Sequence, residues 1–215
     1  MAPAGYLVVG ASLGAAGLLI SGAAVAIRAA VRGGLTIDVG LGRSVRPLGP
    51  MAIAIAAPRD VVFDVAAAPY GPRPPRELRG HVEVLERAPG MVLAAHRTAV
   101  GGDVAVTLEC VIIERPRRIG FRLVRGPVPR VVEEFAFEEV PDGTRLTYRG
   151  ELGTDLWALG RAWGARVAPV WEAAVRRSLE RIKEAAERRA AARASYDPDP
   201  AHRGSRSQAG RDLGR

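Results

Sequence analysis

The stretch that decides the fold is WALGRAWGARVAPVWEAAVRRSLERIKEAAE, residues 157–187. At about 100° per residue, its small and apolar side chains fall on one broad face and its charged side chains on the other. The pattern predicts one long amphipathic helix over residues 155–190. Pro169 falls on the polar side, where a kink is tolerated without a change of phase. Such a helix requires an apolar surface to cover.

The residues before this helix supply that surface as a series of strands. Turn signals such as Pro89-Gly90 and Pro141-Asp142-Gly143 separate short apolar or alternating segments. Short connections make neighbouring strands antiparallel. The pattern predicts six consecutive strands, at residues 81–88, 91–100, 104–115, 118–126, 131–140 and 144–152.

A strand at about 50–57 and a short helix at about 59–67 precede them, joined with almost no loop through Pro58. This junction has neither a glycine nor a serine, and we interpret it as closing one end of a cup, with no chemical role. The fold class is therefore α+β: a seven-stranded antiparallel sheet gripping a long C-terminal helix, over residues 50–190. We expect the polar tail 191–215 to be disordered.

Three stretches carry a resemblance to a known family: IAAPRDVVFDV (55–65), GTRLTYRGEL (143–152) and the helix quoted above. Together they resemble the polyketide cyclase/dehydrase and START-like lipid-transfer superfamily, often called SRPBCC. The resemblance implies a helix-grip fold and binding of a lipid-like or polycyclic hydrophobic molecule between sheet and helix. It carries over no catalytic residue, because the family shares no single catalytic set.

The N-terminal residues 6–27 contain no charged side chain. A helix of that length is about 33 Å long, enough to cross a hydrocarbon core of roughly 30 Å. We expect an uncleaved transmembrane helix, followed by a juxtamembrane linker at 28–49. Its small residues also allow a weak self-association, through a stripe formed by Gly10, Gly14, Gly17, Ser21 and Ala24.

Arginines follow this segment and none precedes it. The positive-inside rule then predicts a single-pass protein of the cytoplasmic (inner) membrane, with its N-terminus outside and its domain in the cytoplasm. The chain holds 30 arginines and one lysine, a bias typical of a bacterium with a GC-rich genome. Residues 51–154 contain 14 arginines and 14 acidic residues, so the domain is neutral and we expect no nucleic-acid partner.

Absent residue types exclude several kinds of chemistry. Residues 51–154 contain no Ser or Lys, which excludes a serine triad or a lysine Schiff base there. The three histidines, His81, His96 and His202, lack metal-ligand spacing, and the chain has one cysteine. We therefore expect no metal and no cofactor.

Strand alternation selects the candidate ligand-binding residues. We expect inward-facing groups on three strands: Ile119, Phe121 and Leu123; Glu133, Phe135 and Phe137; Leu146 and Tyr148. On the strand at 104–115 we expect Val104, Val106, Leu108, Cys110 and Ile112 to face inward. The aromatic side chains of these sets, Phe121, Phe135, Phe137 and Tyr148, either line a ligand cavity or fill the core.

The roles of six candidate residues depend on their environment. Glu133 is an acid with a raised pKa if it is desolvated beside the aromatics, and an ordinary carboxylate if it stays wet. Only one of His96 and Arg97 can face inward, and the sequence does not say which. On the helix, Trp157 and Trp171 bracket Gly164, and either clamp an apolar ligand in the space at the glycine or pack tightly on the sheet.

Three functions remain open. A membrane-anchored protein that binds a hydrophobic small molecule or lipid is favoured. The alternatives are an enzyme of the cyclase or dehydratase kind, using acid and base groups of the cavity, and an interaction module with a filled core. The sequence leaves the ligand, the reaction and the oligomeric state open.

Overall fold

The seven expected strands and the long C-terminal helix are present in the computed structural model, which describes residues 25, 28, 29, 32 and 34–196. The order is β1 (Ser44–Ile55), α2 (Arg59–Ala67), the 3-10 turns η1 (Ala68–Tyr70) and η2 (Arg76–Leu78), β2 (Val82–Ala88), β3 (Met91–Val100), β4 (Asp103–Glu114), β5 (Arg118–Arg125), β6 (Arg130–Val140), β7 (Gly143–Thr154) and α3 (Trp157–Tyr196).

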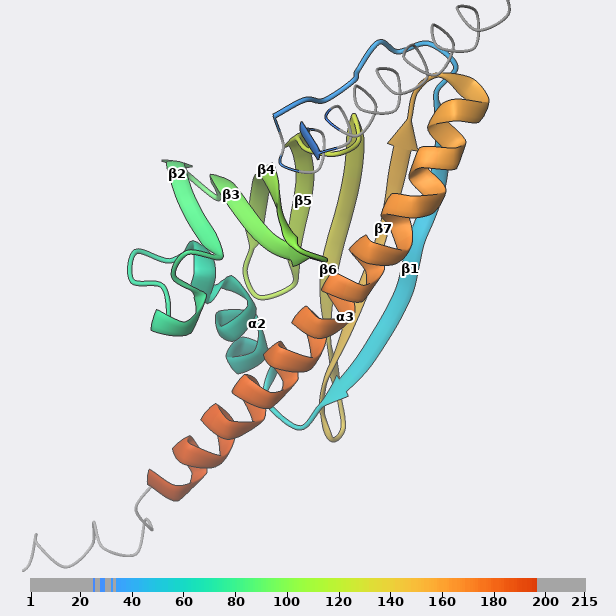
Figure 1. Cartoon of the computed structure of the whole chain (residues 1–215). Helices are drawn as coiled ribbons and strands as arrows, with labels where there is room; N and C mark the ends of the chain where they lie inside the picture. The colour runs from blue at the N-terminus through green and yellow to red at the C-terminus, as the bar shows by residue number, and fades with distance from the viewer. Residues whose placement is uncertain (1–24, 26–27, 30–31, 33, 197–215) are drawn as a thin grey trace, which may run out of the picture.

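The strands form one antiparallel sheet in the order β1-β7-β6-β5-β4-β3-β2. Every neighbouring pair except β1 and β7 is consecutive in the chain, as short hairpin connections require. The curved sheet wraps around α3, which runs across it along β7 and β1, and α2 lies near the middle of the helix's length (Figure 1). The predicted seven-stranded sheet gripping one long helix is confirmed.

The core lies between the concave face of the sheet and the two helices. Helix α2 follows Pro58, whose extended backbone ends the preceding segment, and it buries Val61, Val62 and Phe63. The ring of Phe63 meets that of Phe137 edge-on, with centroids 5.1 Å apart. This contact fixes α2 against β6 and closes one end of the cup.

Strand β1 begins earlier than the sequence pattern indicated. It starts at Ser44, and Leu48, expected in the linker, is only 1% exposed and belongs to the core. Pro47 argued against a strand in the sequence because proline has no backbone N–H to donate to a neighbouring strand. It is tolerated here because β1 is an end strand of the sheet.

The segment before β1 is tied to the start of α3 through Asp155, which is buried. The Asp155 carboxylate accepts hydrogen bonds from the backbone N–H groups of Val39 and Gly40, each at 2.8 Å, and from Arg43 Nε at 2.7 Å. The Arg43 guanidinium and these amides lower the pKa of Asp155 to about 2. The expected linker is thus partly an ordered strap on the domain.

The expected membrane helix, with its small-residue stripe, lies outside the described residues except for Val25. Among the helices that the structure does describe, none combines the length and the apolar character needed to cross a bilayer. The tail beyond residue 196 also lies outside the described residues, and α3 itself continues past the expected end at 190, to Tyr196.

Candidate functional site

The concave face of the sheet carries a row of aromatic rings with polar groups at both ends. Cross-strand pairing places Phe121 opposite Glu133 and Phe135 opposite Tyr148, so these side chains share one face. Phe121 and Phe135 meet at a centroid distance of 5.4 Å, and Phe135 and Tyr148 at 6.0 Å. Tyr70, from η1, extends the row, its ring 6.2 Å from Phe121.

Glu133 forms the polar group at one end of this row. Its Oε2 accepts hydrogen bonds from Tyr148 Oη at 2.7 Å and from Trp171 Nε1 at 2.8 Å. The second bond links β6 to α3 across the concave face. Burial, followed by repulsion from Glu109, raises the pKa of Glu133 from 4.5 to about 7, although both hydrogen bonds oppose the rise. Glu133 therefore exchanges its proton near neutral pH.

His96 and Glu109 form the polar group at the other end. His96 Nδ1 lies 3.0 Å from Glu109 Oε2, and Thr107 Oγ1 donates to Glu109 Oε1 at 2.6 Å. The opposite edge of the imidazole meets the Tyr70 hydroxyl, with Nε2 at 3.3 Å from Oη. The buried carboxylate is thus satisfied by two neighbours, as a buried charge requires.

The charges of this pair are mutually stabilised. Burial disfavours the imidazolium of His96, but the charge and hydrogen bond of Glu109 outweigh burial and raise the pKa of His96 above 6.5. Burial likewise disfavours the Glu109 carboxylate, and the His96 imidazolium outweighs it and lowers the pKa of Glu109 below 4.5. The concave face therefore holds a His96–Glu109 pair whose charged form each partner favours in the other and, beyond the aromatic row, a carboxyl group with a pKa of about 7.

Both tyrosines of the row keep their protons at physiological pH. Burial is the main cause that raises the pKa of Tyr70 well above 10, and the nearby Glu109 charge adds to it. Burial and then the charge of Glu133 also raise the pKa of Tyr148. The two phenols therefore act as hydrogen-bond donors or acceptors. Near neutral pH, the groups of this face that can gain or lose a proton are the carboxyl and imidazole groups.

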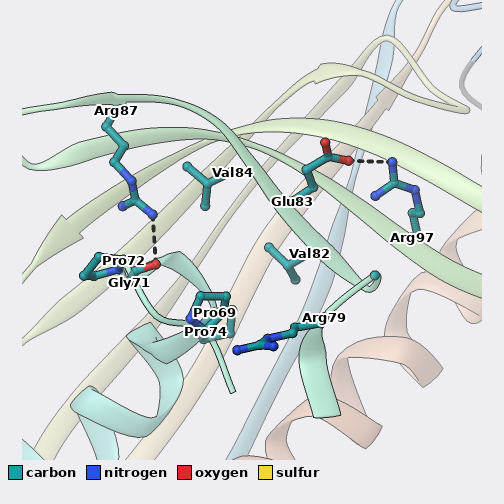
Figure 2. Close-up of a pocket in the computed structure, with 11 residues that line it drawn as sticks. Pro69, Gly71, Pro72, Pro74, Arg79, Val82, Glu83, Val84, Arg87 and Arg97 are labelled. Carbon is teal, nitrogen blue, oxygen red and sulfur yellow. Dashed lines mark hydrogen bonds and ion pairs between the residues drawn. The ribbon is translucent and has the colours of Figure 1, made fainter. Parts of the chain in front are cut away.

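A pocket of about 350 Å³ lies beside this face, between β2 and the proline-rich segment that carries η1 and η2 (Figure 2). Val82 and Val84 line it from β2. They pair with His96 and Ala94 and so share the inner face of the sheet. A volume of this size falls at the lower end of the range of small-molecule sites.

A family match places this chain among known proteins. Residues 51–187 match the family described as polyketide cyclase / dehydrase and lipid transport. The chain belongs to this family. The match covers most of α3 and the whole sheet apart from residues 44–50 of β1. No curated protein sequence matches the chain.

Solved structures share the helix-grip fold of this polyketide cyclase/dehydrase family member. The Zhui aromatase/cyclase from Streptomyces sp. R1128 is 19% identical, with a TM-score of 0.50 over 70% of this chain and 96% of that chain. Norcoclaurine synthase from Thalictrum flavum is 12% identical, with a TM-score of 0.53 over 68% and 87%. The di-domain ARO/CYC StfQ from the steffimycin biosynthetic pathway is 16% identical, with a TM-score of 0.50 over 70% and 52%. At these identities the similarity shows the fold alone.

The structure brings most of the sequence-predicted residues of this family member together. Phe121, Glu133, Phe135 and Tyr148 lie in or beside the aromatic row, and Trp171 reaches it from α3. Phe137, on the same face of β6, is buried against Phe63 in the core.

The choice between His96 and Arg97 is settled by the pairing of β3. His96 pairs with Thr107 on the inner face, whereas Arg97 points outward and forms an ion pair with Glu83 at 2.7 Å. The histidine therefore belongs to the concave face. The arginine belongs to the outer lip of the pocket between β2 and the proline-rich segment.

Two residues of α3 lie differently from the expectation. Trp157 is 60% exposed at the first residue of the helix, with its ring against Gly42, so it lies apart from the aromatic row. Gly164 is closely packed: a Cβ added there would lie 3.2 Å from Thr154 Cγ2 and 3.4 Å from Leu152 Cδ2. The glycine lets helix and β7 approach closely. The hollow of about 250 Å³ that Gly164 lines is shared with Ser44–Pro47, Thr154 and Arg161 and includes no residue of the aromatic row, so the expected ligand space beside the two tryptophans is not found there.

The inward face of β4 was assigned wrongly. Val104 and Ile112 of the expected set are exposed, and the inner face instead carries Thr107, Glu109 and Val111. The strand is apolar on both faces, so composition favoured the wrong one. Its true orientation follows from pairing with β3 and from a bulge in β5. Cys110 lies on the same outer side and is partly exposed.

Sequence reasoning thus missed Tyr70, Thr107 and Glu109. A signal for Glu109 was available: a single acid inside the apolar run VTLECVII, two residues after a threonine, two strands before Glu133. No comparable signal marked Tyr70, which lies in the 3-10 turn η1 at the start of the proline-rich segment. Within the described residues, no three His, Cys, Asp or Glu side chains come together as metal ligands.

Proposed function

We propose that this chain binds a hydrophobic small molecule, lipid-like or with fused rings, on the concave face between the sheet and α3. The observation that carries the proposal is that Phe135 and Trp171 face the concave side from opposite elements and both remain partly exposed, beside the three buried rings of Tyr70, Phe121 and Tyr148. Aromatic side chains of a filled core would be fully buried. Polar groups at both ends of an otherwise apolar wall are typical of a ligand site.

Membership of the family supports the same proposal. The solved structures with this fold include aromatase/cyclases and norcoclaurine synthase, the latter also in complex with dopamine and hydroxybenzaldehyde. The part of the proposal that goes beyond the family is the placement: apolar rings against Phe121, Phe135 and Trp171, with hydrogen-bonding groups toward Glu133 at one end and His96 at the other.

Native mass spectrometry of the full chain, purified from its own host, tests binding. We expect a bound apolar molecule at one copy per chain. Phe135→Trp adds bulk to the concave face and should release it, whereas Val124→Trp adds the same ring to an exposed outer position and should not. Chains that carry no ligand from the host and bind no polycyclic probe would refute the proposal.

A second candidate, an enzyme of the cyclase or dehydratase kind, is favoured by one observation. Glu133 has a pKa of about 7 and lies on the same concave face as His96. A group that titrates near the working pH is suited to general acid–base catalysis, which contributes about 10²–10⁴-fold. In such a reaction Glu133 would give a proton to a carbonyl or departing hydroxyl oxygen and be reprotonated from solvent.

Turnover of a linear poly-β-ketone thioester, followed as ring formation with loss of water, separates the two candidates. Glu133→Gln should lower turnover at least about 100-fold if the carboxyl acts as the acid, while the same variant still binds the compound. Wild-type binding without turnover would leave binding as the function.

We further propose that residues 6–27 anchor the chain in the cytoplasmic membrane with the domain inside. The uncharged stretch and the arginines that follow it support this placement. Trp157 and Leu159, both well exposed at the start of α3, lie beside the strap that leads from this stretch. The full chain should stay in membrane pellets after carbonate washing, and a reporter at the C-terminus should be active only in the cytoplasm. A chain released by the wash would refute the anchor.

A further inference from the structure

The pocket beside β2 combines an apolar wall with a cationic rim (Figure 2). Its apolar part consists of prolines of the segment 69–80 and two valines of β2: Pro69, Pro72, Pro74, Val82 and Val84. Its charged part consists of Arg79, Arg87 and Arg97 with one carboxylate, Glu83. Three positive charges against one negative charge leave a net charge of +2 on the lining.

The three arginines differ in how far their charge is compensated. Arg97 is paired with Glu83 at 2.7 Å. Arg87 donates to the backbone carbonyls of Tyr70, at 2.5 Å, and Gly71, at 2.8 Å, which hold the side chain in place without neutralising it. Arg79 makes no side-chain hydrogen bond or ion pair within the described residues, and its side chain, which lines the pocket, extends toward Pro69 and Pro74 in Figure 2.

The pocket adjoins the aromatic row through consecutive residues. Pro69 lines the pocket, and the next residue, Tyr70, places its ring beside Phe121 and its hydroxyl against His96. Val82 pairs with His96, so the floor of the pocket continues the inner face of the sheet. The cationic pocket therefore lies next to the Tyr70–His96 end of the aromatic row.

We propose that the ligand is an amphipathic organic acid whose carboxylate, or an equivalent anionic head group, binds Arg79 at this pocket. The guanidinium is suited to this role because it is permanently charged and presents several donors in one plane. Arg87 keeps the local potential positive, and the prolines and valines take the adjoining apolar segment. This inference rests on the proposed function, since the aromatic row holds the body of the same molecule.

Binding of 1-pyrenedodecanoate and of its neutral amide to the purified full chain tests the inference. The two probes share ring system and chain and differ in the charge of the head group. Energy transfer from tryptophan to pyrene reports binding. We expect the acid to bind at least about tenfold more tightly, as a charge-assisted hydrogen bond implies, and the preference to weaken as salt is added.

Arg79→Gln should reduce this preference to less than about threefold and leave the affinity for the amide unchanged. Arg73→Gln is the matched control, because Arg73 is exposed in the same segment and does not line the pocket. Both side chains lie at the surface, so both variants should fold. Equal binding of acid and amide, or equal effects of the two substitutions, would overturn the anion site while binding itself stands. Failure of both probes to bind would overturn the proposed function and this inference with it.

Discussion

Replacement of Glu133 by glutamine should make the protein's stability less dependent on pH. The folded-state pKa of Glu133 is about 7, against an ordinary value of 4.5. A raised pKa means that the group's stabilising contribution is fully present below pH 4.5 and is lost as the pH rises through 7. The difference between these two pKa values corresponds to about 3 kcal/mol in the free energy of unfolding. Because part of the side chain remains accessible, we expect about 1–3 kcal/mol.

Urea unfolding of wild type and Glu133→Gln at pH 5 and at pH 8 measures the effect. Glutamine keeps an oxygen that accepts from Tyr148 and Trp171 but cannot ionise. The free energy of unfolding of wild type minus that of the variant should fall by about 1–3 kcal/mol from pH 5 to pH 8. Effects of other titrating groups, including His96, are common to both proteins and largely cancel.

Glu134→Gln is the matched control. Glu134 is the next residue on β6, faces outward and pairs with Arg118 and Arg149. The free energy of unfolding of wild type minus that of Glu134→Gln should change by less than about 1 kcal/mol between pH 5 and pH 8, as for an exposed ion pair. A difference for Glu133→Gln that is flat, or that rises with pH, would refute the desolvated carboxyl and with it the acid–base candidate.

Three further substitutions test other parts of the structure. Asp155→Asn should lower the melting temperature more than Asp38→Asn, because both acids contact Arg43 but only Asp155 is buried and accepts backbone hydrogen bonds; equal effects would contradict the strap. Gly164→Leu should cost about 1–3 kcal/mol by overpacking, seen in urea unfolding, and an unchanged midpoint would show that free space exists there. Trp171→Phe removes a hydrogen bond to Glu133 and should raise the pKa of that carboxyl further, measured by infrared titration of the carboxyl band; a lowered pKa would contradict the bond.

The sequence predicted the architecture because the fold depends on patterns that repeat over many residues. The amphipathic period of the C-terminal helix and the alternation within six hairpin-linked strands each involve many side chains. Individual errors are therefore averaged out. Boundaries depend on one or two residues, and Pro47 was enough to conceal the first six residues of β1.

The site was less predictable because it depends on contacts between distant segments. The inner face of β4 is set by pairing with its neighbours, so Glu109 could not be placed next to His96 from its own strand. Burial of Glu133 depends on Trp171, 38 residues away on α3. Trp157 has the same helical phase as the packed residues, but the backbone turns at the start of the helix and leaves it outside.

A crystal structure of the full chain with 1-pyrenedodecanoate tests the central claim most directly. The claim is that the concave face between the sheet and α3 is a binding site for a hydrophobic molecule. We predict that the pyrene lies against Phe121, Phe135 and Trp171, with the carboxylate directed toward Arg79. Pyrene bound elsewhere, with no electron density between the aromatic row and Trp171, would contradict the claim and identify the domain as one with a filled core.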